Sequence, residues 1–414
     1  MTIRKISLII MLMLLITGCT VKHDNFPDKN DKEEEKITEE HNQEKEEPPD
    51  QIRLQVENMT LEEKIGQMLL VGMEGYDMND SITELIKSYN VGGIILYGKN
   101  VKDGRQLLSL TNSLKNTNSS NKIPLFISVD EEGGSVSRNP KEVKKLPTAK
   151  DIGKTKNTDL AFEAGKLLGK TVKAFGYNMD FAPVLDIDSN PLNPVIGDRA
   201  FGQTAEIVSA MGIGVFKGIK EEGVIPVIKH FPGHGDTITD SHIGLPVITH
   251  SWERLNNFEI VPFKHAIDNG ADVVMVAHIL LLQIDQEYPA SMSDVVITNI
   301  LRDRLKFQGV IITDDMTMGA IEENYNIDEA AVQSVKAGAD IVLVGHNHEN
   351  SVKVFNALKE GVEKDNISID KIDKSVYRIL KLKEKYNLKD SVIEDLNIEE
   401  INKEIDGLGQ LQAG

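Results

Sequence analysis

The sequence predicts an α/β fold. Eight short apolar runs, each of a length typical of a buried strand, occur between residues 68 and 344. Segments long enough for a helix separate these runs, and this alternation indicates βαβ units and a parallel sheet. Ionisable residues directly follow most of the runs. Eight such strands in one domain favour a (β/α)8 barrel, although the hydrophobic period alone also fits a doubly wound open sheet.

The first 20 residues have the layout of a secretory signal peptide. A basic start precedes an apolar run at residues 6–16, which is too short for a typical membrane span. The ending Leu15–Cys19 resembles a bacterial lipobox, which implies removal of residues 1–18 and a lipid on Cys19. This pattern predicts a secreted protein that is lipid-anchored on the outer face of the bacterial cytoplasmic membrane. An ordinary signal peptide with an incidental cysteine is the alternative.

Residues 19–50 are predicted to carry the lipidated cysteine and a disordered acidic tether. Between Lys22 and Asp50 the chain has 12 Asp or Glu against 5 Lys, with almost no large apolar side chains. Such a segment cannot bury enough apolar surface to fold, and as a coil it spans roughly 30 Å root-mean-square. An acidic binding tail is the competing interpretation. The formal charge of −19 for the whole chain argues against a nucleic-acid partner.

The folded part is expected to begin near residue 51. Leu54–Gly66 is predicted to be an opening helix, with Thr60 as an N-cap and Glu63 completing a capping box. The strands are expected at residues 68–71, 93–97, 125–129, 179–184, 224–228, 273–277, 310–312 and 341–344. The helices between them are expected at residues 81–89, 160–175, 205–222, 255–269, 295–307 and 330–337.

Two closing helices are expected at residues 352–362 and 372–386. They would complete a single catalytic domain that spans residues 51–390. The last segment, residues 391–414, is acidic and then rich in small residues, and we expect it to be a frayed C-terminal tail. No second domain is expected after the barrel.

The stretch Lys229–Pro246, KHFPGHGDTITDSHIGLP, contains an unusual number of ionisable side chains. It follows an apolar run, and Pro232 and Gly233 break regular structure, so a loop is expected. Other strand ends also carry polar residues, namely Asp130, Asp186, His278, Asp314, Asp315 and His346. In a barrel the carboxyl ends of the strands lie at one face, where catalytic residues sit. These side chains are therefore expected to converge.

The order KHFPGHG, DSH and GLP resembles the bacterial β-N-acetylglucosaminidases of glycoside hydrolase family 3. The resemblance implies a TIM-like (β/α)8 barrel as the fold, and it implies that Asp240 and His242 act as the general acid/base dyad. The segment Asp314–Met318 resembles the family's nucleophile motif, in which the first aspartate attacks. Strand alternation predicts that Asp315 points away from the barrel mouth, where it would cap the next helix.

The chemistry of these residue types fits a retaining glycosidase, which needs a carboxylate nucleophile and an acid that protonates the leaving oxygen. A histidine with an ordinary pKa of about 6.5 can give and take a proton near neutral pH. A neighbouring carboxylate fixes its tautomer. A neutral imidazole also repels an incoming anion less than a carboxylate does. Phosphate could therefore replace water, and a phosphorylase is an alternative.

The resemblance also implies a set of sugar-binding residues. These are Asp130 in VDEEGG, Arg138, Arg199 in IGDRAF, and the neighbours Lys229 and His230. Asp198 is the expected salt-bridge partner of Arg199, and a structural pairing of Lys229 with an aspartate is an alternative to sugar binding. Ser135 departs from the arginine that is usual at that place, which leaves the shape of the pocket wall open.

No metal and no organic cofactor are predicted. His230 and His234 have the spacing of a zinc pair on a helix, but Pro232 lies between them. The other close pair, His346 and His348, lacks an obvious third ligand. Trp252, the only tryptophan, fits either the core or a platform for a sugar.

The sequence thus predicts a retaining exo-β-N-acetylglucosaminidase that removes terminal N-acetylglucosamine from peptidoglycan fragments by double displacement. Its expected partners are a carbohydrate substrate and, through Cys19, a membrane. A phosphorylase or a broader β-glycosidase is the alternative within the same site, and a non-catalytic sugar-binding lipoprotein is the alternative from another class. The preference for the aglycone and the oligomeric state are left open.

Overall fold

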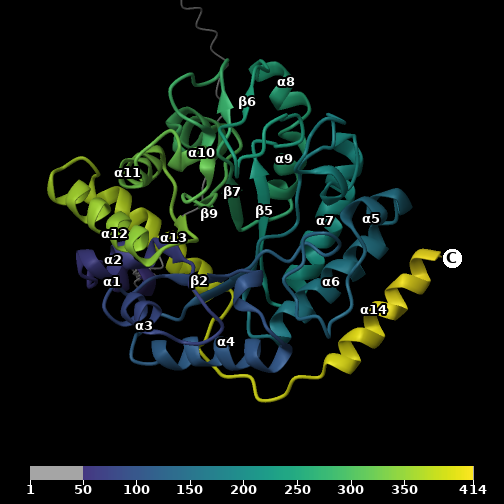
Figure 1. Cartoon of the computed structure of the whole chain (residues 1–414). Helices are drawn as coiled ribbons and strands as arrows, with labels where there is room; N and C mark the ends of the chain where they lie inside the picture. The colour runs from purple at the N-terminus through teal and green to yellow at the C-terminus, as the bar shows by residue number, and fades with distance from the viewer. Residues whose placement is uncertain (1–49, 414) are drawn as a thin grey trace, which may run out of the picture. The chain divides into compact units, whose positions relative to one another are not determined.

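Eight parallel strands organise residues 50–413, the part of the chain that the computed structural model describes (Figure 1). They are β1 (Leu69–Val71), β2 (Gly93–Leu96), β3 (Phe126–Val129), β4 (Met179–Asp180), β5 (Ile225–Phe231), β7 (Val273–Val276), β9 (Val310–Thr313) and β10 (Val342–Val344). They pair in the order β10-β1-β2-β3-β4-β5-β7-β9. A parallel bridge between Ile312 and Ile341 joins the two outer strands, so the sheet forms a nearly closed barrel. The predicted (β/α)8 architecture is confirmed.

Each of the eight predicted strands is present, and two differ in length by more than one residue. The strand β4 has only two residues, whereas β5 continues for seven and includes Lys229 and His230. The extension is stabilised by pairing with the segment after β4, because the N–H of Leu185 donates to the carbonyl of Lys229 at 2.6 Å. The Lys229 and His230 side chains are therefore presented by a strand and not by a loop.

Helices cover the outside of the barrel (Figure 1). They are α1 (Gln51–Glu57), α2 (Leu61–Gln67), α3 (Asp80–Lys87), α4 (Gly104–Asn118), α5 (Ala149–Thr155), α6 (Thr158–Ala174), α7 (Ala205–Glu221), α8 (Trp252–Asn257), α9 (Val261–Asp268), α10 (Gly319–Glu322), α11 (Ile327–Ala337), α12 (His348–Glu363), α13 (Ile369–Lys385) and α14 (Ile398–Ala413). A π-helix, η4 (Val295–Arg304), takes the place of the helix expected at residues 295–307. Short 3-10 turns are η1 (Gly98–Asn100), η2 (Gly197–Arg199) and η3 (Ala290–Met292).

Two predicted helices are each divided in the structure. The opening helix is split at Thr60, whose side chain accepts the N–H of Glu63 while the Glu63 carboxylate accepts the N–H of Thr60. This is the predicted capping box, and it begins α2. The helix expected at 255–269 is divided into α8 and α9, and Pro262 lies in the first turn of α9, a position that tolerates a missing N–H.

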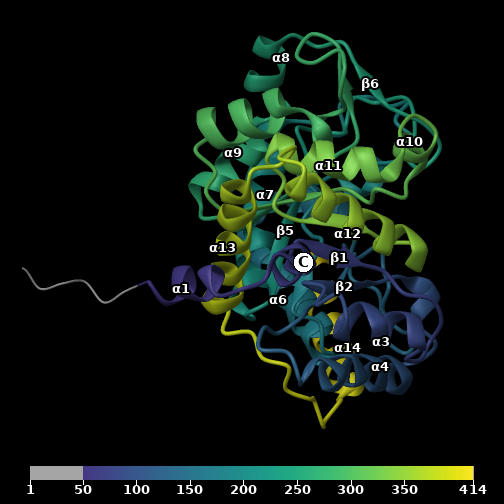
Figure 2. The same ribbon diagram turned by 90° about the vertical axis from the view of Figure 1, so that its left-hand side faces the viewer.

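A small second sheet extends beyond the barrel. It pairs β6 (Val247–Ile248) with β8 (Leu280–Leu281). These strands follow β5 and β7 in the chain, and in Figure 2 β6 lies with α8 at one end of the molecule, beyond the barrel strands. The segment that joins β5 to β6, residues 232–246, contains the predicted dyad and therefore lies on this side of the barrel.

The expectation of a frayed tail at residues 391–414 is wrong. Most of this segment forms α14, which packs against α6. Glu404 lies 2.5 Å from Nζ of Lys170, and Asp406 lies 2.7 Å from Nζ of Lys144. Buried apolar residues such as Ile401 add a hydrophobic contact that the acidic composition of the segment conceals.

The predicted signal peptide, Cys19 and the acidic tether lie outside the described residues. Within residues 50–413, no helix combines the length and the apolar character that crossing a membrane requires.

Candidate active site

A cavity of about 370 Å³ opens at the carboxyl ends of the barrel strands. Every residue predicted for catalysis or sugar binding borders it, except Asp240, whose partner His242 does. The polar side chains around it are those of Tyr97, Asp130, Glu132, Arg138, Arg199, Lys229, His230, His234, Ser241, His242, Asp314, Asp315, Thr317 and His346. The predicted convergence of the strand ends is therefore observed, and Asp314 and His242 open onto the same space.

A larger cavity, of about 800 Å³, lies at the opposite end of β9, between α1 and α13. Two ion pairs lie among its charged side chains: Asp272 is 2.5 Å from Nζ of Lys385, and Asp370 is 2.6 Å from Nζ of Lys374. None of the predicted catalytic or sugar-binding residues borders it. The smaller cavity is therefore the candidate active site, since it lies at the carboxyl ends of the strands and is bordered by the predicted catalytic and sugar-binding residues.

Asp314 immediately follows β9. Its N–H donates to the carbonyl of Val276 at 2.9 Å, and its carboxylate accepts the N–H of Asp315 at 2.9 Å. Burial by itself raises the pKa of Asp314, but the charges of His278 and His230, together with this N–H, hold it below its ordinary value. The carboxylate is thus kept ionised, as a nucleophile requires.

Asp315 differs from its prediction in two ways. Asp315 borders the cavity together with Asp314, whereas it was expected to point away from the barrel mouth. It does not cap α10, whose N-cap is Met318. Instead its Oδ1 accepts the N–H groups of Thr317 and Gly345, at 3.0 and 2.8 Å, and its Oδ2 accepts the hydroxyl of Tyr97 at 3.1 Å. Asp315 therefore joins the loops after β2, β9 and β10.

Asp240 and His242 form the predicted pair. Nδ1 of His242 lies 2.8 Å from Oδ1 of Asp240, and the same oxygen accepts the N–H of His242 at 2.9 Å. Burial by itself raises the pKa of Asp240, but these two hydrogen bonds hold it below its ordinary value. The His242 side chain is 66% exposed, so its remaining nitrogen is accessible at the cavity mouth.

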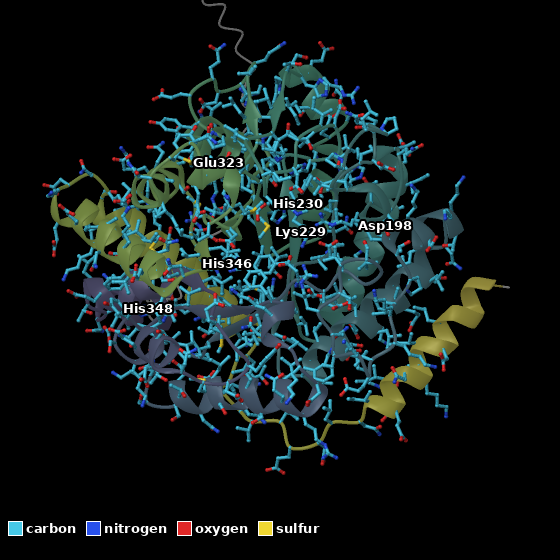
Figure 3. All side chains as sticks on the ribbon, viewed as in Figure 1. Asp198, Lys229, His230, Glu323, His346 and His348 are labelled. Carbon is cyan, nitrogen blue, oxygen red and sulfur yellow. The ribbon has the colours of Figure 1, made fainter. Side chains whose placement is uncertain are left out.

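A charged cluster around Lys229, which Figure 3 labels, also borders the cavity. Nζ of Lys229 lies 2.5 Å from Asp130 and 2.7 Å from Glu132. Glu132 also accepts two hydrogen bonds from Arg199, at 2.7 and 2.8 Å. Burial by itself raises the pKa of Glu132, whereas Lys229 and Arg199 hold it well below its usual range. The predicted salt bridge between Arg199 and Asp198 is wrong, because Glu132 is the partner.

His230 is oriented by Asp186. Nδ1 of His230 lies 2.6 Å from Oδ2 of Asp186, and Oδ1 of Asp186 accepts the N–H of His234 at 2.7 Å. Burial by itself raises the pKa of Asp186, but the charge and hydrogen bond of His230 hold it below its ordinary value. The Nε2 atom of His230 is directed towards the cavity side, where Arg199 lies 3.5 Å away. His230 can thus donate or accept at a sugar hydroxyl.

Arg138 lies on a loop that a buried carboxyl organises. Glu131, only 1% exposed, accepts the backbone N–H of Arg138 at 2.6 Å and that of Asn139 at 3.2 Å. The loop therefore returns towards the end of β3, which places Arg138 near Asp130 at the cavity. Ser135, where the family has an arginine, donates to Asp198 at 2.9 Å.

Several residues at the site had been given no catalytic or sugar-binding role from the sequence, among them Tyr97, Glu132, Asp186 and His278. Glu132 and Asp186 act through side-chain pairs that only the folded chain brings together. Nε2 of His278 donates to the carbonyl of Asp315 at 2.9 Å, and Nδ1 of His278 lies 2.7 Å from the hydroxyl of Ser291. Asp186 and His278 already stood out as polar residues after a strand, and that signal could have identified them.

One group of described residues has the composition of a metal site. The donor atoms of Asp236, His250 and Glu259 lie within 4.8 Å of one another. Glu259, however, already accepts two hydrogen bonds from Arg254 on its Oε1 atom, at 3.0 and 2.8 Å. The guanidinium therefore supplies the positive charge that these carboxylates need. His230 and His234 extend from β5 and the following turn, not from one helix face.

Trp252 does not border the candidate site. It begins α8, is packed against the core, and carries the guanidinium of Arg304 over its ring at 4.7 Å. The interpretation of Trp252 as a core residue is the one that fits.

Comparisons with known proteins agree with this architecture. The family model described as "Glycosyl hydrolase family 3 N terminal domain" matches residues 60–382. Beta-hexosaminidase A of Pseudoalteromonas piscicida is 35% identical over 328 residues, which cover 73% of this chain and 55% of that protein. Beta-hexosaminidase of Tolumonas auensis is 33% identical over 294 residues, which cover 70% of this chain and 86% of that protein.

A solved structure is also similar. The glycoside hydrolase family 3 β-N-acetylglucosaminidase from Paenibacillus sp. str. FPU-7 superposes with a TM-score of 0.81 at 39% identity, covering 85% of this chain and 68% of that one. The family model and these relatives extend over most of the barrel. The chain therefore belongs to glycosyl hydrolase family 3, and it is a glycoside hydrolase.

Proposed function

We propose that the protein is a retaining exo-β-N-acetylglucosaminidase. The observation that carries the proposal is that Asp314, His242 with its partner Asp240 behind it, and a cluster of charged groups able to bind hydroxyls meet at one cavity. A carboxylate and an acid on two sides of one sugar are what double displacement needs. The cavity volume of about 370 Å³ is at the lower end of the range for ligand pockets, which suits one terminal sugar.

In the first step the Asp314 carboxylate attacks the anomeric carbon. The bond from that carbon to the glycosidic oxygen breaks, and a proton from Nε2 of His242 goes to the departing oxygen. The product is a glycosyl ester of Asp314 and a neutral imidazole. Asp240 holds the other ring nitrogen as an N–H donor, so that Nε2 is the atom that exchanges the proton.

In the second step the neutral His242 takes a proton from water. The water oxygen bonds to the anomeric carbon, the ester bond to Asp314 breaks, and the sugar leaves with its original configuration. Asp130, Arg138, Arg199, Lys229 and His230 would hold the hydroxyl groups through both steps. The carboxylate accepts from hydroxyls, and the cationic groups donate to their oxygens.

The choice of N-acetylglucosamine is supported by the relatives, whose names are β-hexosaminidase and β-N-acetylglucosaminidase. The same names favour hydrolysis over phosphorolysis. Peptidoglycan fragments as substrates, and a lipid anchor on Cys19, belong to the proposal as well. Their support is the export and lipobox pattern at the N-terminus, which would place the enzyme beside the cell wall.

A panel of aryl β-glycosides tests the proposal. The N-acetylglucosaminide should be cleaved at least about 100-fold faster than the glucoside and xyloside, with free N-acetylglucosamine as the product. Adding phosphate should leave the product unchanged. N-acetylglucosamine 1-phosphate would show that the phosphorylase alternative is correct, and binding without turnover of any glycoside would favour the non-catalytic alternative. Release of N-acetylglucosamine from muropeptides tests the wall substrate separately.

A further inference from the structure

The loop that carries the dyad is not held by apolar burial. Ile238 and Ile243, which lie on either side of Asp240 and His242, are 69% and 70% exposed. Large apolar side chains usually fix a loop by packing beneath it, and these do not. Polar and backbone contacts must therefore hold the loop in place.

Those contacts are concentrated at Ser241, the residue between the two dyad members. Ser241 is only 3% exposed. Its carbonyl accepts the N–H of Ala320 at 3.0 Å, and its hydroxyl lies 3.3 Å from Nε2 of His234. Ala320 is in the first turn of α10, six residues after Asp314. The loop that carries the dyad, residues 232–246, is therefore hydrogen-bonded to the segment that follows the nucleophile.

Gly319, the residue before Ala320, makes this contact possible. A Cβ atom at Gly319 would lie 2.6 Å from the carbonyl oxygen of His242, and 3.2 Å from the carbonyl carbons of His242 and Ile243. All three are backbone atoms, so no side-chain rotation could relieve the overlap. Any side chain at this position would push the backbone of the acid/base residue outwards.

We propose that Gly319 is a positioning residue for the acid/base, and that the turn Gly319–Ala320 sets the distance between Asp314 and His242. This inference rests on the catalytic roles given to those two residues under Proposed function. Because the same short segment follows the nucleophile and supports the acid, the two groups are held in one rigid relation across the sugar. A displacement of about 1 Å in such a relation can cost about 100-fold in rate.

The test compares Gly319→Ala with Gly244→Ala. Gly244 is on the same loop, but a Cβ there would meet only Cγ2 of Thr239, at an ordinary 3.8 Å. For Gly319→Ala we expect kcat/KM on a β-linked disaccharide of N-acetylglucosamine to fall about 100-fold. On the 2,4-dinitrophenyl glycoside, which needs little protonation, formation of the glycosyl-enzyme should change by less than about fivefold. The Gly244→Ala variant should resemble the wild type on both substrates.

A second variant disturbs the same contact from Ala320. Ala320→Pro deletes the N–H that Ser241 accepts and places the proline Cδ atom against that carbonyl, in a first helical turn that tolerates proline. It should show the same dependence on the leaving group as Gly319→Ala. For both variants the circular dichroism spectrum and the thermal midpoint should match those of the wild type. An equal loss on both substrates, or full activity of both variants on the disaccharide, would overturn the positioning role.

His242→Ala, measured in parallel, separates this inference from the mechanism beneath it. If His242→Ala shows the leaving-group dependence and the two turn variants do not, the positioning role fails and the acid/base assignment stands. If His242→Ala does not show it either, the acid/base assignment itself fails, and the positioning role fails with it.

Discussion

Nδ1 of His242 lies 2.8 Å from Oδ1 of Asp240, and that oxygen also accepts the backbone N–H of His242. The two bonds close a compact ring within three residues, so the imidazole is oriented by its own loop. The arrangement directs Nε2 away from the carboxylate, which leaves this nitrogen as the atom that can deliver a proton to a substrate.

The first prediction concerns this pair. Replacing His242 by Ala should lower kcat/KM on the disaccharide by about 10²- to 10⁴-fold, because the leaving oxygen is no longer protonated. The activated dinitrophenyl glycoside should lose much less in the step that forms the glycosyl-enzyme. Asp240→Asn should show the same trend with a smaller loss. Steady-state and pre-steady-state kinetics on both substrates measure this, and equal losses on both would make His242 a structural residue.

The second prediction concerns Glu132. Its carboxylate lies between the cations of Lys229 and Arg199, and the side chain is only 5% exposed. Glu132→Gln would leave the buried Arg199 without its carboxylate partner and Lys229 with Asp130 alone, at a cost of about 3 kcal/mol or more. We expect sugar binding and kcat/KM to fall by a similar factor for good and poor leaving groups. The matched control is Asp198→Asn, which should stay close to wild type because Asp198 contacts Ser135 and not Arg199.

If Asp198→Asn proves as damaging as Glu132→Gln, the pairing of Arg199 in the structure is not the one that matters in solution. Inhibition constants for N-acetylglucosamine, measured for both variants, would reveal this without reference to turnover.

The third prediction concerns stability and pH. Burial raises the pKa of Glu131 from 4.5 to about 7, next to Asp180, whose pKa burial also raises. Between pH 4.5 and pH 7 the folded protein keeps a proton on Glu131 that the unfolded chain has lost. The stabilisation from Glu131 is therefore complete below about pH 4.5 and is lost as the pH rises through 7. The difference between the two pKa values of Glu131 corresponds to about 3 kcal/mol in the free energy of unfolding.

Glu131→Gln removes this titration while keeping an oxygen that can accept the loop N–H groups. Relative to wild type, the variant should gain about 3 kcal/mol in free energy of unfolding between pH 4.5 and pH 8. Denaturant unfolding at several pH values measures the change. Glu323→Gln, at an exposed surface position, serves as the control and should show no such trend. A difference that stays constant with pH would exclude the raised pKa.

The fourth prediction concerns a buried lysine at the other end of the barrel. Nζ of Lys383 donates to Gln67 and to the carbonyl of Gly92, both at 2.8 Å, and burial lowers its pKa from 10.5 to about 7. Between pH 7 and 10.5 the unfolded chain keeps a proton on Lys383 that the folded protein has lost. The free energy of unfolding of the wild type therefore rises with pH through this window. Relative to wild type, the free energy of unfolding of Lys383→Met should therefore be highest at or below pH 7 and should be lower by pH 10. Thermal midpoints at the two ends of the window measure this, and parallel curves would contradict it.

The barrel could be predicted because its strands are short and apolar and are separated by helical segments, a pattern that local sequence shows directly. The same is true of Asp314, which follows β9, and of the loop that carries His242. The resemblance to glycoside hydrolase family 3 then supplied the roles that spacing alone does not give.

The parts that escaped prediction depend on contacts between distant segments. Arg199 pairs with Glu132, 67 positions away in the chain, and not with its neighbour Asp198. Asp315 has the sequence context of a helix cap, but Tyr97 and Gly345 reach it from other strands. The helix α14 looked like a frayed tail because the acidic composition of its segment conceals its buried apolar residues, and its contact with α6 adds salt bridges to them.

The central claim is that Asp314 becomes covalently bound to the sugar while His242 exchanges the proton. The most direct measurement is mass spectrometry of His242→Ala after rapid mixing with dinitrophenyl β-N-acetylglucosaminide, because loss of the general base slows breakdown of the ester. The account predicts that the peptide containing Asp314 gains one N-acetylglucosaminyl group, and that Asp314→Ala does not form this adduct. An adduct on a different residue, or turnover by Asp314→Ala at the wild-type rate, would contradict the account.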